Sequence, residues 1–251
     1  MKIGVIGLGL IGGSIFKDLK KLDDYEVAAV SVSQNGKDIY KDYEVLKTCN
    51  LIFVCSAMNK TLGILDRLDE ILPPETTVTD VCSLKRFVCA KQRPYQFVPS
   101  HPMAGTEHRG YENSKEGLFQ GAVWVLTPVF GLDERLVKVI KQLGAKPIIT
   151  TPEKHDEAAA LISHMPMVIA QSIFKTAQEN NLALEMAASG FRDMTRLALS
   201  NTEMASDMVQ MNSDYIQTAI LKLYKSIGDL TNSNYLAQIN EIKLNRQSMF
   251  L

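Results

Sequence analysis

His101 is the residue of this chain whose type and setting best suit acid–base chemistry. It lies in the run Ser-His-Pro-Met-Ala-Gly-Thr-Glu at 100–107, directly after a predicted strand. Histidine is the commonest general base in enzymes, because its imidazole takes up a proton near neutral pH. Ser83, in the segment 80–85, could orient that imidazole or a substrate hydroxyl. The alternatives are a histidine hydrogen-bonded within a turn and a serine that caps the next helix.

Arg192 is a candidate for binding a carboxylate. Gly190, in Ser-Gly-Phe-Arg-Asp at 189–193, is predicted to end a helix and to leave Arg192 in a short connection. A guanidinium there can bind a carboxylate through two parallel hydrogen bonds. The alternative is a surface ion pair with Asp193.

The histidines and cysteines show no spacing typical of a metal site. His155 and His164 are nine residues apart, which places them on opposite faces of a helix, so we predict that they share no metal. The cysteines include no Cys-x-x-Cys pair and are expected to be buried, reduced thiols: Cys49, Cys55, Cys82 and Cys89. We therefore predict no metal cofactor.

The loop at 7–12 has the spacing Gly-x-Gly-x-x-Gly. Gly7 permits a tight turn, Gly9 lets the backbone approach a pyrophosphate, and Gly12 allows close contact between helix and strand. The amides at the start of the helix that follows, those of Leu10 and Ile11 among them, then face the phosphates. Because the loop follows a predicted strand and opens a predicted helix, it predicts a dinucleotide cofactor. A purely structural glycine turn is the alternative.

The turn after the second predicted strand bears on the choice of cofactor. An acid that binds the ribose hydroxyls of NAD is expected about 20 residues after such a loop, but none occurs before Asp38. Ser31, Ser33 and Lys37 could instead donate to a 2′-phosphate, which favours NADP, with NAD as the second choice. A solvent-exposed polar turn is the alternative. Ser56, after the third strand, is expected at the same edge.

These candidates need a sheet that brings the ends of its strands to one edge, and the first part of the chain predicts one. Apolar, β-branched runs occur at 3–6, 27–32, 51–55, 77–81, 97–99, 123–127 and 147–151, with helix-like segments such as 60–72 and 132–143 between several of them. Apolar strands that alternate with helices are typical of a parallel sheet covered on both faces. We expect an α/β Rossmann-type domain over residues 1–151.

From residue 152 the composition becomes that of a helical domain. Only two of the 15 glycines lie beyond Pro152, against eight of the 11 methionines. Pro152 suits the first turn of a helix, and Pro166 is expected to kink that helix. Five later apolar residues are spaced four, three, four, three, as in a short coiled coil: Ile216, Ile220, Leu223, Ile227 and Leu230. They form either a core stripe or a subunit interface, and we expect residues 152–251 to form an all-α dimerisation domain.

The net charge of the chain is close to zero, with a formal value of −1 and a pI of about 6.4. No overall positive field would attract nucleic acid or an anionic membrane. We find no apolar stretch that we judge long enough for a signal peptide or a membrane span. The expectation is a cytoplasmic protein that binds neither nucleic acid nor membrane and catches anionic ligands locally.

Five motifs occur in order along the first 200 residues: the glycine loop, Asp-x-x-Ser-x-Lys at 80–85, His-Pro-Met-Ala-Gly-Thr-Glu at 101–107, Ile-Ser-His-Met-Pro at 162–166 and Ser-Gly-Phe-Arg-Asp at 189–193. Together they resemble the prephenate and arogenate dehydrogenases of tyrosine biosynthesis. The resemblance implies a Rossmann domain followed by a helical domain that builds a homodimer. It also implies oxidative decarboxylation of a small cyclohexadienyl substrate with a nicotinamide cofactor.

The same resemblance implies roles for individual residues. His101 takes the proton of the ring hydroxyl while hydride passes from that carbon to the nicotinamide and carbon dioxide leaves. Ser83 hydrogen-bonds the same hydroxyl or His101, and Arg192 binds a substrate carboxylate. Glu107 helps to gate the site, and His164 belongs to a motif expected beside the substrate.

The chain departs from the family pattern in two places. Many relatives that use prephenate carry a second histidine after Ser-His-x-Pro, and here that position is Met167. This favours arogenate, whose side chain carries an amine where prephenate has a keto group. The segment 34–50 is also short for the family and leaves little room for a full second helix.

Two other functions fit part of the sequence. Oxidoreductases of the pyrroline-carboxylate and β-hydroxyacid types also join a Rossmann domain to a helical one. The latter usually need a lysine followed by an asparagine, which Lys175 in Lys-Thr-Ala-Gln matches poorly, and neither explains the motif around His101. A non-enzymatic nicotinamide-binding regulator that dimerises through its helices would bind the cofactor without turnover.

Overall fold

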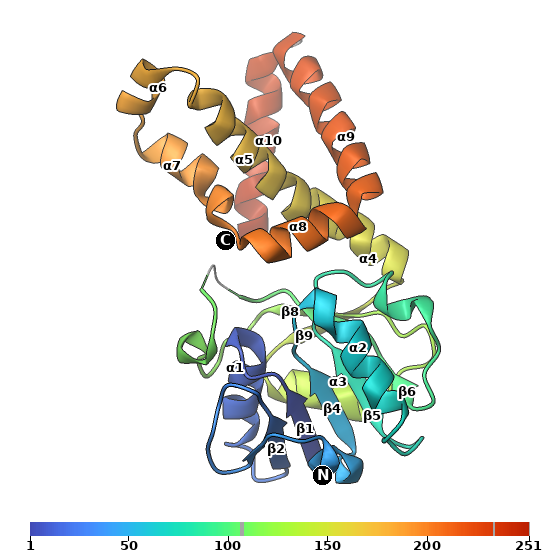
Figure 1. Ribbon diagram of the computed structural model, residues 1–251. Coiled ribbons are helices and arrows are strands. Elements are labelled where there is room, and N and C mark those ends of the chain that lie inside the picture. Colours follow the sequence, from blue (N-terminus) through green and yellow to red (C-terminus); the bar gives the residue numbers. More distant parts are fainter. Residues whose placement is uncertain (106–107, 233, 251) are drawn as a thin grey trace.

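A parallel sheet of six strands forms the centre of the amino-terminal half of the molecule (Figure 1). The computed structural model describes residues 1–105, 108–232 and 234–250. The strand order is β3-β2-β1-β4-β5-β6, with strands Lys2–Ile6 (β1), Glu26–Val30 (β2), Ile39–Tyr40 (β3), Leu51–Val54 (β4), Thr77–Asp80 (β5) and Gln96–Phe97 (β6). The order changes direction at β1, so the crevice outside the carboxyl ends of β1 and β4 is where such a sheet binds ligands. The predicted α/β Rossmann-type fold is confirmed.

Three further strands form a second, smaller sheet: Ser100–Pro102 (β7), Val123–Leu126 (β8) and Lys146–Ile149 (β9). β7 pairs antiparallel with β8, which pairs parallel with β9. The strand predicted at 97–99 is wrong in its position, because Pro99 has no amide proton to donate to a ladder. The last strand of the six-stranded sheet therefore ends at Phe97. His101 lies inside β7 rather than after a strand.

Helices cover the sheets at three places: Leu10–Leu19 (α1), Met58–Asp69 (α2) and Glu134–Gln142 (α3). The side chain of Asp133 caps α3 by accepting a hydrogen bond from the amide of Arg135. Between β2 and β4 the chain forms only β3 and a 3₁₀ segment, Glu44–Thr48 (η1). The short connection expected at 34–50 is thereby confirmed.

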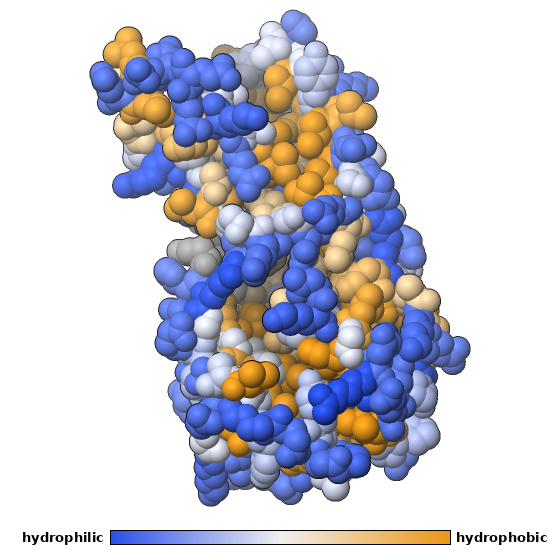
Figure 2. Space-filling view, viewed as in Figure 1, coloured by the Kyte–Doolittle hydropathy of each residue, from blue (hydrophilic) through white to orange (hydrophobic). Residues whose placement is uncertain are grey.

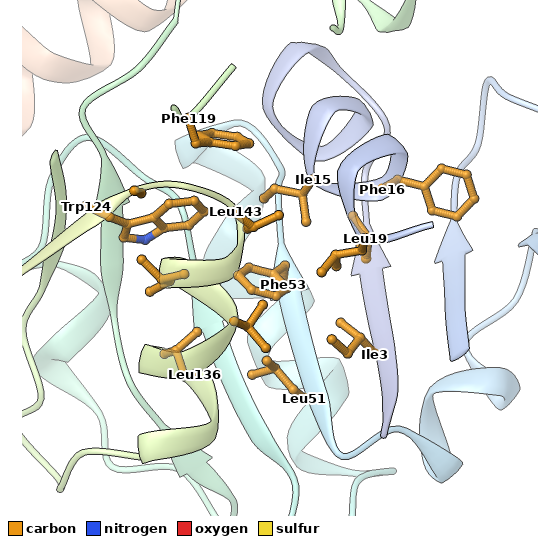
Figure 3. Packing of buried hydrophobic residues seen from close by; sticks show 14 of the residues in the cluster. Ile3, Ile15, Phe16, Leu19, Leu51, Phe53, Phe119, Trp124, Leu136 and Leu143 are labelled. Carbon is orange, nitrogen blue, oxygen red and sulfur yellow. The ribbon is translucent and has the colours of Figure 1, made fainter. Parts of the chain in front are cut away.

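Both faces of the central sheet are apolar. Alternate residues of each strand point to opposite sides, so successive apolar residues line both faces. On one face Phe53 of β4 packs with α1, α3 and Trp124 of β8, and the two rings meet edge-on with centroids 6.1 Å apart (Figure 3). On the other face Ile52 packs against Leu65 and Leu68 of α2. Burial on both faces explains why the strands read as unbroken apolar runs.

The described carboxyl-terminal half is helical throughout (Figure 1). Its segments are Pro152–Ala159 (α4), Ala160–His164 (η4), Met165–Ala177 (α5), Asn181–Glu185 (α6), Ser189–Thr195 (α7), Arg196–Leu199 (η5), Thr202–Met211 (α8), Ser213–Asn232 (α9) and Tyr235–Phe250 (α10). The Thr151 side chain caps α4 by accepting a hydrogen bond from the amide of Lys154. α8 packs against α2 and so joins the two halves.

α4, η4 and α5 form one helix of 26 residues, from Pro152 to Ala177. η4 is a π-helical turn that ends just before Met165. It lies directly ahead of Pro166, the residue at which we predicted a kink. Since proline lacks the amide that an α-helix requires, a widened turn ahead of it is a way to accommodate it. By length and composition this helix could cross a membrane, which corrects our expectation that no such stretch exists. Within one chain, 28% of its apolar window is buried.

The helical half exposes extensive apolar surface in a single chain (Figure 2). The most exposed apolar side chains of this half are Met186, Leu199, Leu221, Tyr224, Leu236 and Met249. None of the described side chains of α10 is buried. In the predicted seam on α9, Ile216 is buried but Ile227 is 52% exposed. The apolar side chains of this seam are therefore buried at its start and exposed at its end.

Candidate active site

The loop between β1 and α1 approaches its neighbours so closely that two of its glycines cannot be replaced without displacing backbone. Gly7 has a φ of +86°, and a β-carbon there would lie 2.6 Å from the carbonyl oxygen of Cys55. A β-carbon at Gly12 would lie 2.0 Å from the carbonyl oxygen of Gly7. At Gly9, by contrast, no heavy atom lies within 4 Å of the β-carbon position. This open space is what a pyrophosphate needs to approach the backbone.

The first turn of α1 faces this space without a competing side chain. Gly9 occupies the N-cap position and, since glycine has no side chain, no side-chain hydrogen bond caps the amides that follow, including those of Leu10 and Ile11. The first turn also holds no acidic residue. Ser56 follows β4 beside Gly7, and its hydroxyl shares a 2.8 Å hydrogen bond with Thr61. The residues present therefore fit a dinucleotide phosphate.

The turn after β2 has no unpaired acid. Ser31 is buried, whereas Ser33 and Lys37 are exposed. The carboxylate of Asp38, the first acid after the strand, pairs with Lys20 at 2.6 Å. A 2′-phosphate would therefore meet hydroxyls and a lysine here, and no free carboxylate.

Lys41 organises the same turn, and we did not predict it. Its ammonium donates hydrogen bonds to the backbone carbonyls of Ser31, Val32 and Gln34, at 3.0, 3.0 and 2.7 Å. The amide of Gln34 in turn donates to the Ser31 hydroxyl at 3.1 Å. A fixed positive charge thus lies under the turn that would receive the adenosine end of the cofactor.

His101 is joined to two residues of α4 by a chain of hydrogen bonds. Nδ1 of His101 lies 3.0 Å from Nε2 of His155, and Nδ1 of His155 lies 2.7 Å from Oδ1 of Asp156. The two rings meet edge-on with centroids 5.2 Å apart. His155 and Asp156 are buried, whereas His101 is partly exposed. Among the described residues, the hydrogen bond of the His101 ring is made by Nδ1 and none is made by Nε2, so this nitrogen is the candidate atom for a ligand.

The surroundings of His101 favour its neutral form. Burial lowers the pKa of His101 well below its usual 6.5, and the nearby charges of His155, Lys85 and His164 act in the same direction. Burial also opposes the charge of Asp156, but hydrogen bonds from His155 and from the amides of Arg86 and Lys85 outweigh it and lower the pKa of that carboxyl. At neutral pH the chain therefore runs from a carboxylate to a neutral imidazole that can accept a proton.

A buried ion pair fixes the strand that carries His101. The Lys85 ammonium lies 2.5 Å from Oδ2 of Asp80 and 2.5 Å from the carbonyl oxygen of Ser100, and both charged side chains are fully buried. Oδ1 of Asp80 accepts the amide of Ser100 at 3.2 Å. Trp124 donates its indole N–H to the Ser100 hydroxyl. The Asp and Lys of the 80–85 motif thus hold the residue next to His101.

The hydroxyl of Ser83 does not reach His101 in this structure. It donates to the sulfur of Met58 at 3.3 Å. Its neighbours Cys82 and Leu84 enter an apolar cluster with Met58 of α2 and with Met167, which is 3% exposed. Met167 therefore packs between the two halves of the chain.

His155 and His164 are both buried and both act electrostatically on His101, which corrects the expectation that they face opposite ways. The amide nitrogen of Asn212 contacts both Nδ1 of His164, at 3.2 Å, and the carbonyl oxygen of Asp156, at 2.9 Å. The π turn of η4 causes the difference, because its wider spiral changes the angle between residues nine apart. In the described part of the chain, no three His, Cys, Asp or Glu side chains are grouped as metal ligands.

Arg192 and Glu107 are not brought to His101 by the described structure. Arg192 lies inside α7, with its side chain 81% exposed and its Nε 3.8 Å from Asp193. The predicted helix end at Gly190 is wrong, because the break falls earlier, at Ala188, whose extended backbone precedes α7. Glu107 falls outside the described residues.

Two family models match the chain, one on each half. Residues 21–149 match "Prephenate dehydrogenase, nucleotide-binding domain" and residues 151–242 match "Prephenate dehydrogenase, dimerization domain". The chain belongs to the prephenate dehydrogenase family. This confirms the resemblance carried by the five motifs, and it favours a dehydrogenase over the two alternatives.

Individual relatives agree with the prephenate dehydrogenase models. A prephenate dehydrogenase of Bacillus subtilis (strain 168) is 34% identical over 236 residues, which cover 84% of this chain and 64% of that protein. One of Lactococcus lactis subsp. cremoris (strain MG1363) is 29% identical over 89% of this chain and 72% of that protein. The crystal structure of Synechocystis arogenate dehydrogenase has a TM-score of 0.81 at 31% identity, covering 99% of this chain and 97% of that one. This chain thus spans less than two thirds of the Bacillus protein.

Within this prephenate dehydrogenase fold, the residues missed from the sequence besides Lys41 belong to the hydrogen-bond network behind His101: His155, Asp156 and Asn212. An adjacent His-Asp pair just after a predicted helix start was the available signal. The partner of this pair, His101, lies in another element of the other half. Contacts between the halves cannot be read from spacing within one element.

Proposed function

We propose that this protein oxidatively decarboxylates a small cyclohexadienyl acid, with arogenate as the favoured substrate and NADP as the favoured cofactor. The observation that carries the proposal is the setting of His101. It is a histidine held neutral, tied through Nδ1 to His155, with Nε2 left for a ligand. Family membership supports the reaction class.

In the proposed reaction His101 is the general base. Its Nε2 takes the proton of the ring hydroxyl as the carbon–oxygen bond becomes a carbonyl. The bound nicotinamide supplies the acceptor for the hydride that leaves the same carbon. Loss of the ring carboxylate as carbon dioxide then returns its bonding electrons to the ring, which becomes aromatic. The former carbonyl oxygen becomes a phenolate and takes back the proton held on Nε2 of His101, which gives the phenol hydroxyl and restores the neutral base. Lys85 and Asp80 keep the base in position through Ser100.

For the cofactor, we propose binding by the glycine loop and by the turn after β2. Gly7, Gly9 and Gly12, with the amides of Leu10 and Ile11, would hold the pyrophosphate, and Ser56 would border it. Ser31, Ser33 and Lys37 would meet the adenosine ribose. The pairing of Asp38 with Lys20 and the charge of Lys41 support a 2′-phosphate, hence NADP over NAD.

For the substrate, we propose that Arg192 binds a carboxylate, that Ser83 hydrogen-bonds the ring hydroxyl or His101, and that Glu107 gates the site. The high exposure of the Arg192 guanidinium and its long distance from Asp193 leave it available to a ligand. His164 would border the substrate beside the other two histidines. Met167, apolar and packed at the junction of the halves, supports arogenate because it offers no donor to the side-chain keto group of prephenate.

We further propose a cytoplasmic homodimer built from domains 1–151 and 152–251. The exposed apolar surface of α9 and α10 and the match to a dimerisation domain support the dimer. The four cysteines are unpaired, as expected in a reducing compartment. The near-neutral charge gives nucleic acid no attractive field, and an apolar subunit interface accounts for the helix from Pro152 to Ala177 without a membrane.

The decisive experiment follows reduced-nicotinamide absorbance for the purified protein with the four pairings of arogenate or prephenate with NADP or NAD. We expect the largest kcat/KM with arogenate and NADP. His101→Ala is the matched inactive control, with turnover about 10²–10⁴-fold lower and cofactor affinity unchanged. Absence of turnover in all four pairings would refute the dehydrogenase, and preference for prephenate or NAD would refute the finer assignment.

A further inference from the structure

His155 and Asp156 have no role in the proposed reaction, yet both are buried and their contacts converge on the base. Besides its contact with His155, Asp156 accepts two hydrogen bonds from the protein and forms one ion pair. Oδ1 accepts the amide of Lys85 at 2.8 Å, Oδ2 accepts the amide of Arg86 at 3.0 Å, and the Arg86 Nε lies 3.4 Å from Oδ2. A carboxyl with this many donors is held ionised.

An ionised Asp156 determines where the protons of both imidazoles lie. A carboxylate can only accept, so Nδ1 of His155 must donate to it. In a neutral His155, Nε2 then carries the lone pair and can only accept from His101.

We propose that His155 and Asp156 are positioning residues that fix the tautomer of His101, with its proton on Nδ1 and its lone pair on Nε2. The opposite tautomer would present an N–H to the substrate hydroxyl and could not take its proton. His155 belongs to α4 and His101 to β7, so the base acquires its correct tautomer only while the helical half is docked on the sheet. The catalytic part of this inference rests on the proposed function, and the tautomer itself does not.

The first test is a nitrogen–proton NMR spectrum of the full-length protein labelled with ¹⁵N-histidine at neutral pH, without substrate. The protonated and unprotonated ring nitrogens resonate far apart, and single substitutions of the four histidines assign the signals. We expect His101 with Nδ1 protonated and Nε2 unprotonated. In His155→Phe, which keeps a ring but cannot accept a hydrogen bond, we expect a mixture of both tautomers. Protonation at Nε2 in the wild type, or an unchanged tautomer in the variant, would overturn the proposal.

The second test is steady-state kinetics on the same proteins. His155→Phe should lower kcat by about 10- to 100-fold, a part of what a general base contributes, with KM within about twofold. His155→Gln places an amide that can accept where Nε2 was, and it should recover most of kcat and the wild-type tautomer. A residue that only stabilised the fold would leave the tautomer of the folded protein unchanged.

The two tests separate the two proposals. If the wild type turns over none of the substrate pairings, the proposed function fails while the spectrum still decides the tautomer. If the wild type is active but Gln restores neither kcat nor the tautomer, the positioning role fails alone. If His155→Phe does not fold, the spectra of the wild type and of His155→Gln remain sufficient, because the proposal predicts a proton on Nδ1 of His101 in both proteins.

Discussion

The charges around His101 keep it neutral, as the proposed proton transfer requires, at the cost of stability in acid. Burial disfavours a proton on the imidazole, and the charges of His155, Lys85 and His164 act in the same direction. A base that stays neutral is ready to accept a proton at physiological pH. The same burial means that acid protonates the unfolded chain more readily than the folded one.

We expect the free energy of unfolding to fall as the pH drops below about 6.5. Burial lowers the pKa of His164 from 6.5 to about 4. Between these values the unfolded chain holds a proton at this residue and the folded protein does not, so stability is lost as pH falls. His164 alone contributes a loss of about 2 kcal/mol between pH 7 and pH 5. Urea unfolding at both values should show a correspondingly smaller loss for His164→Gln; an equal loss would contradict this.

Arg192→Ala should mainly weaken substrate binding. Loss of a charge-assisted hydrogen bond to a carboxylate costs about 1.5–3 kcal/mol, which corresponds to roughly a 10- to 100-fold rise in KM for the acid. The matched control is Arg196→Ala, which removes another exposed arginine of the same region. Initial rates at varied substrate concentration measure both. An Arg192→Ala enzyme with the KM of the control would remove this residue from the site.

The loop between β1 and α1 shows how one element meets two different demands on its glycines. Gly7 and Gly12 are required by contacts within the protein, whereas Gly9 is required only if something outside the protein approaches it. Gly9 has φ −93° and ψ −154°, which other residues adopt freely. Substitutions in this element can therefore separate cofactor binding from folding.

Gly9→Ala should lower cofactor affinity at least tenfold while changing the free energy of unfolding by no more than about 0.5 kcal/mol. Gly12→Ala should destabilise the protein by about 1–3 kcal/mol or more, because its β-carbon meets the Gly7 carbonyl. Gly63→Ala on α2, where a β-carbon also meets open space, is the control and should leave cofactor affinity unchanged. NADP titration and urea unfolding measure the two effects. Unchanged affinity in Gly9→Ala would argue against a phosphate at this loop.

Elements were predictable where their pattern is local. Apolar runs located β1, β2, β4 and β5 to within one or two residues, and the Thr151–Pro152 pair located the start of α4. The π turn before Pro166 was not predictable, since its sequence is equally compatible with an α-helix. For the same reason, spacing alone placed His155 and His164 on opposite faces. The antiparallel pairing of β7 depends on β8, more than twenty residues away, and no local signal reports it.

At the scale of the whole molecule, the site exists only because the halves are docked. Arg86, next to the motif lysine, reaches from the sheet half to Asp214 at 2.7 and 2.8 Å and to Asn212 at 3.0 Å, and it stacks over Tyr215. The motifs at 80–85 and 162–166 could be placed in separate elements from the sequence. Sequence spacing does not encode the packing that brings these elements together and places His155 against His101.

The purified protein should have twice the mass of its 27.9 kDa chain in light scattering. Leu236→Asp on α10, which places a charge on a 68% exposed apolar position, should shift it toward the monomer. Leu62→Asp on α2 is the control, since it charges an exposed leucine outside the helical half. A monomeric wild type, or equal masses for the two variants, would exclude an interface at α10.

The helix from Pro152 to Ala177 has a consequence for how the protein is made. It is about 39 Å long at 1.5 Å per residue, and most of its apolar window is uncovered within one chain. A newly synthesised chain therefore displays a surface with the composition of a membrane span. Such a surface promotes aggregation until it is covered. With the proposed homodimer, the yield of native protein in a cell would depend on how soon two chains meet after synthesis.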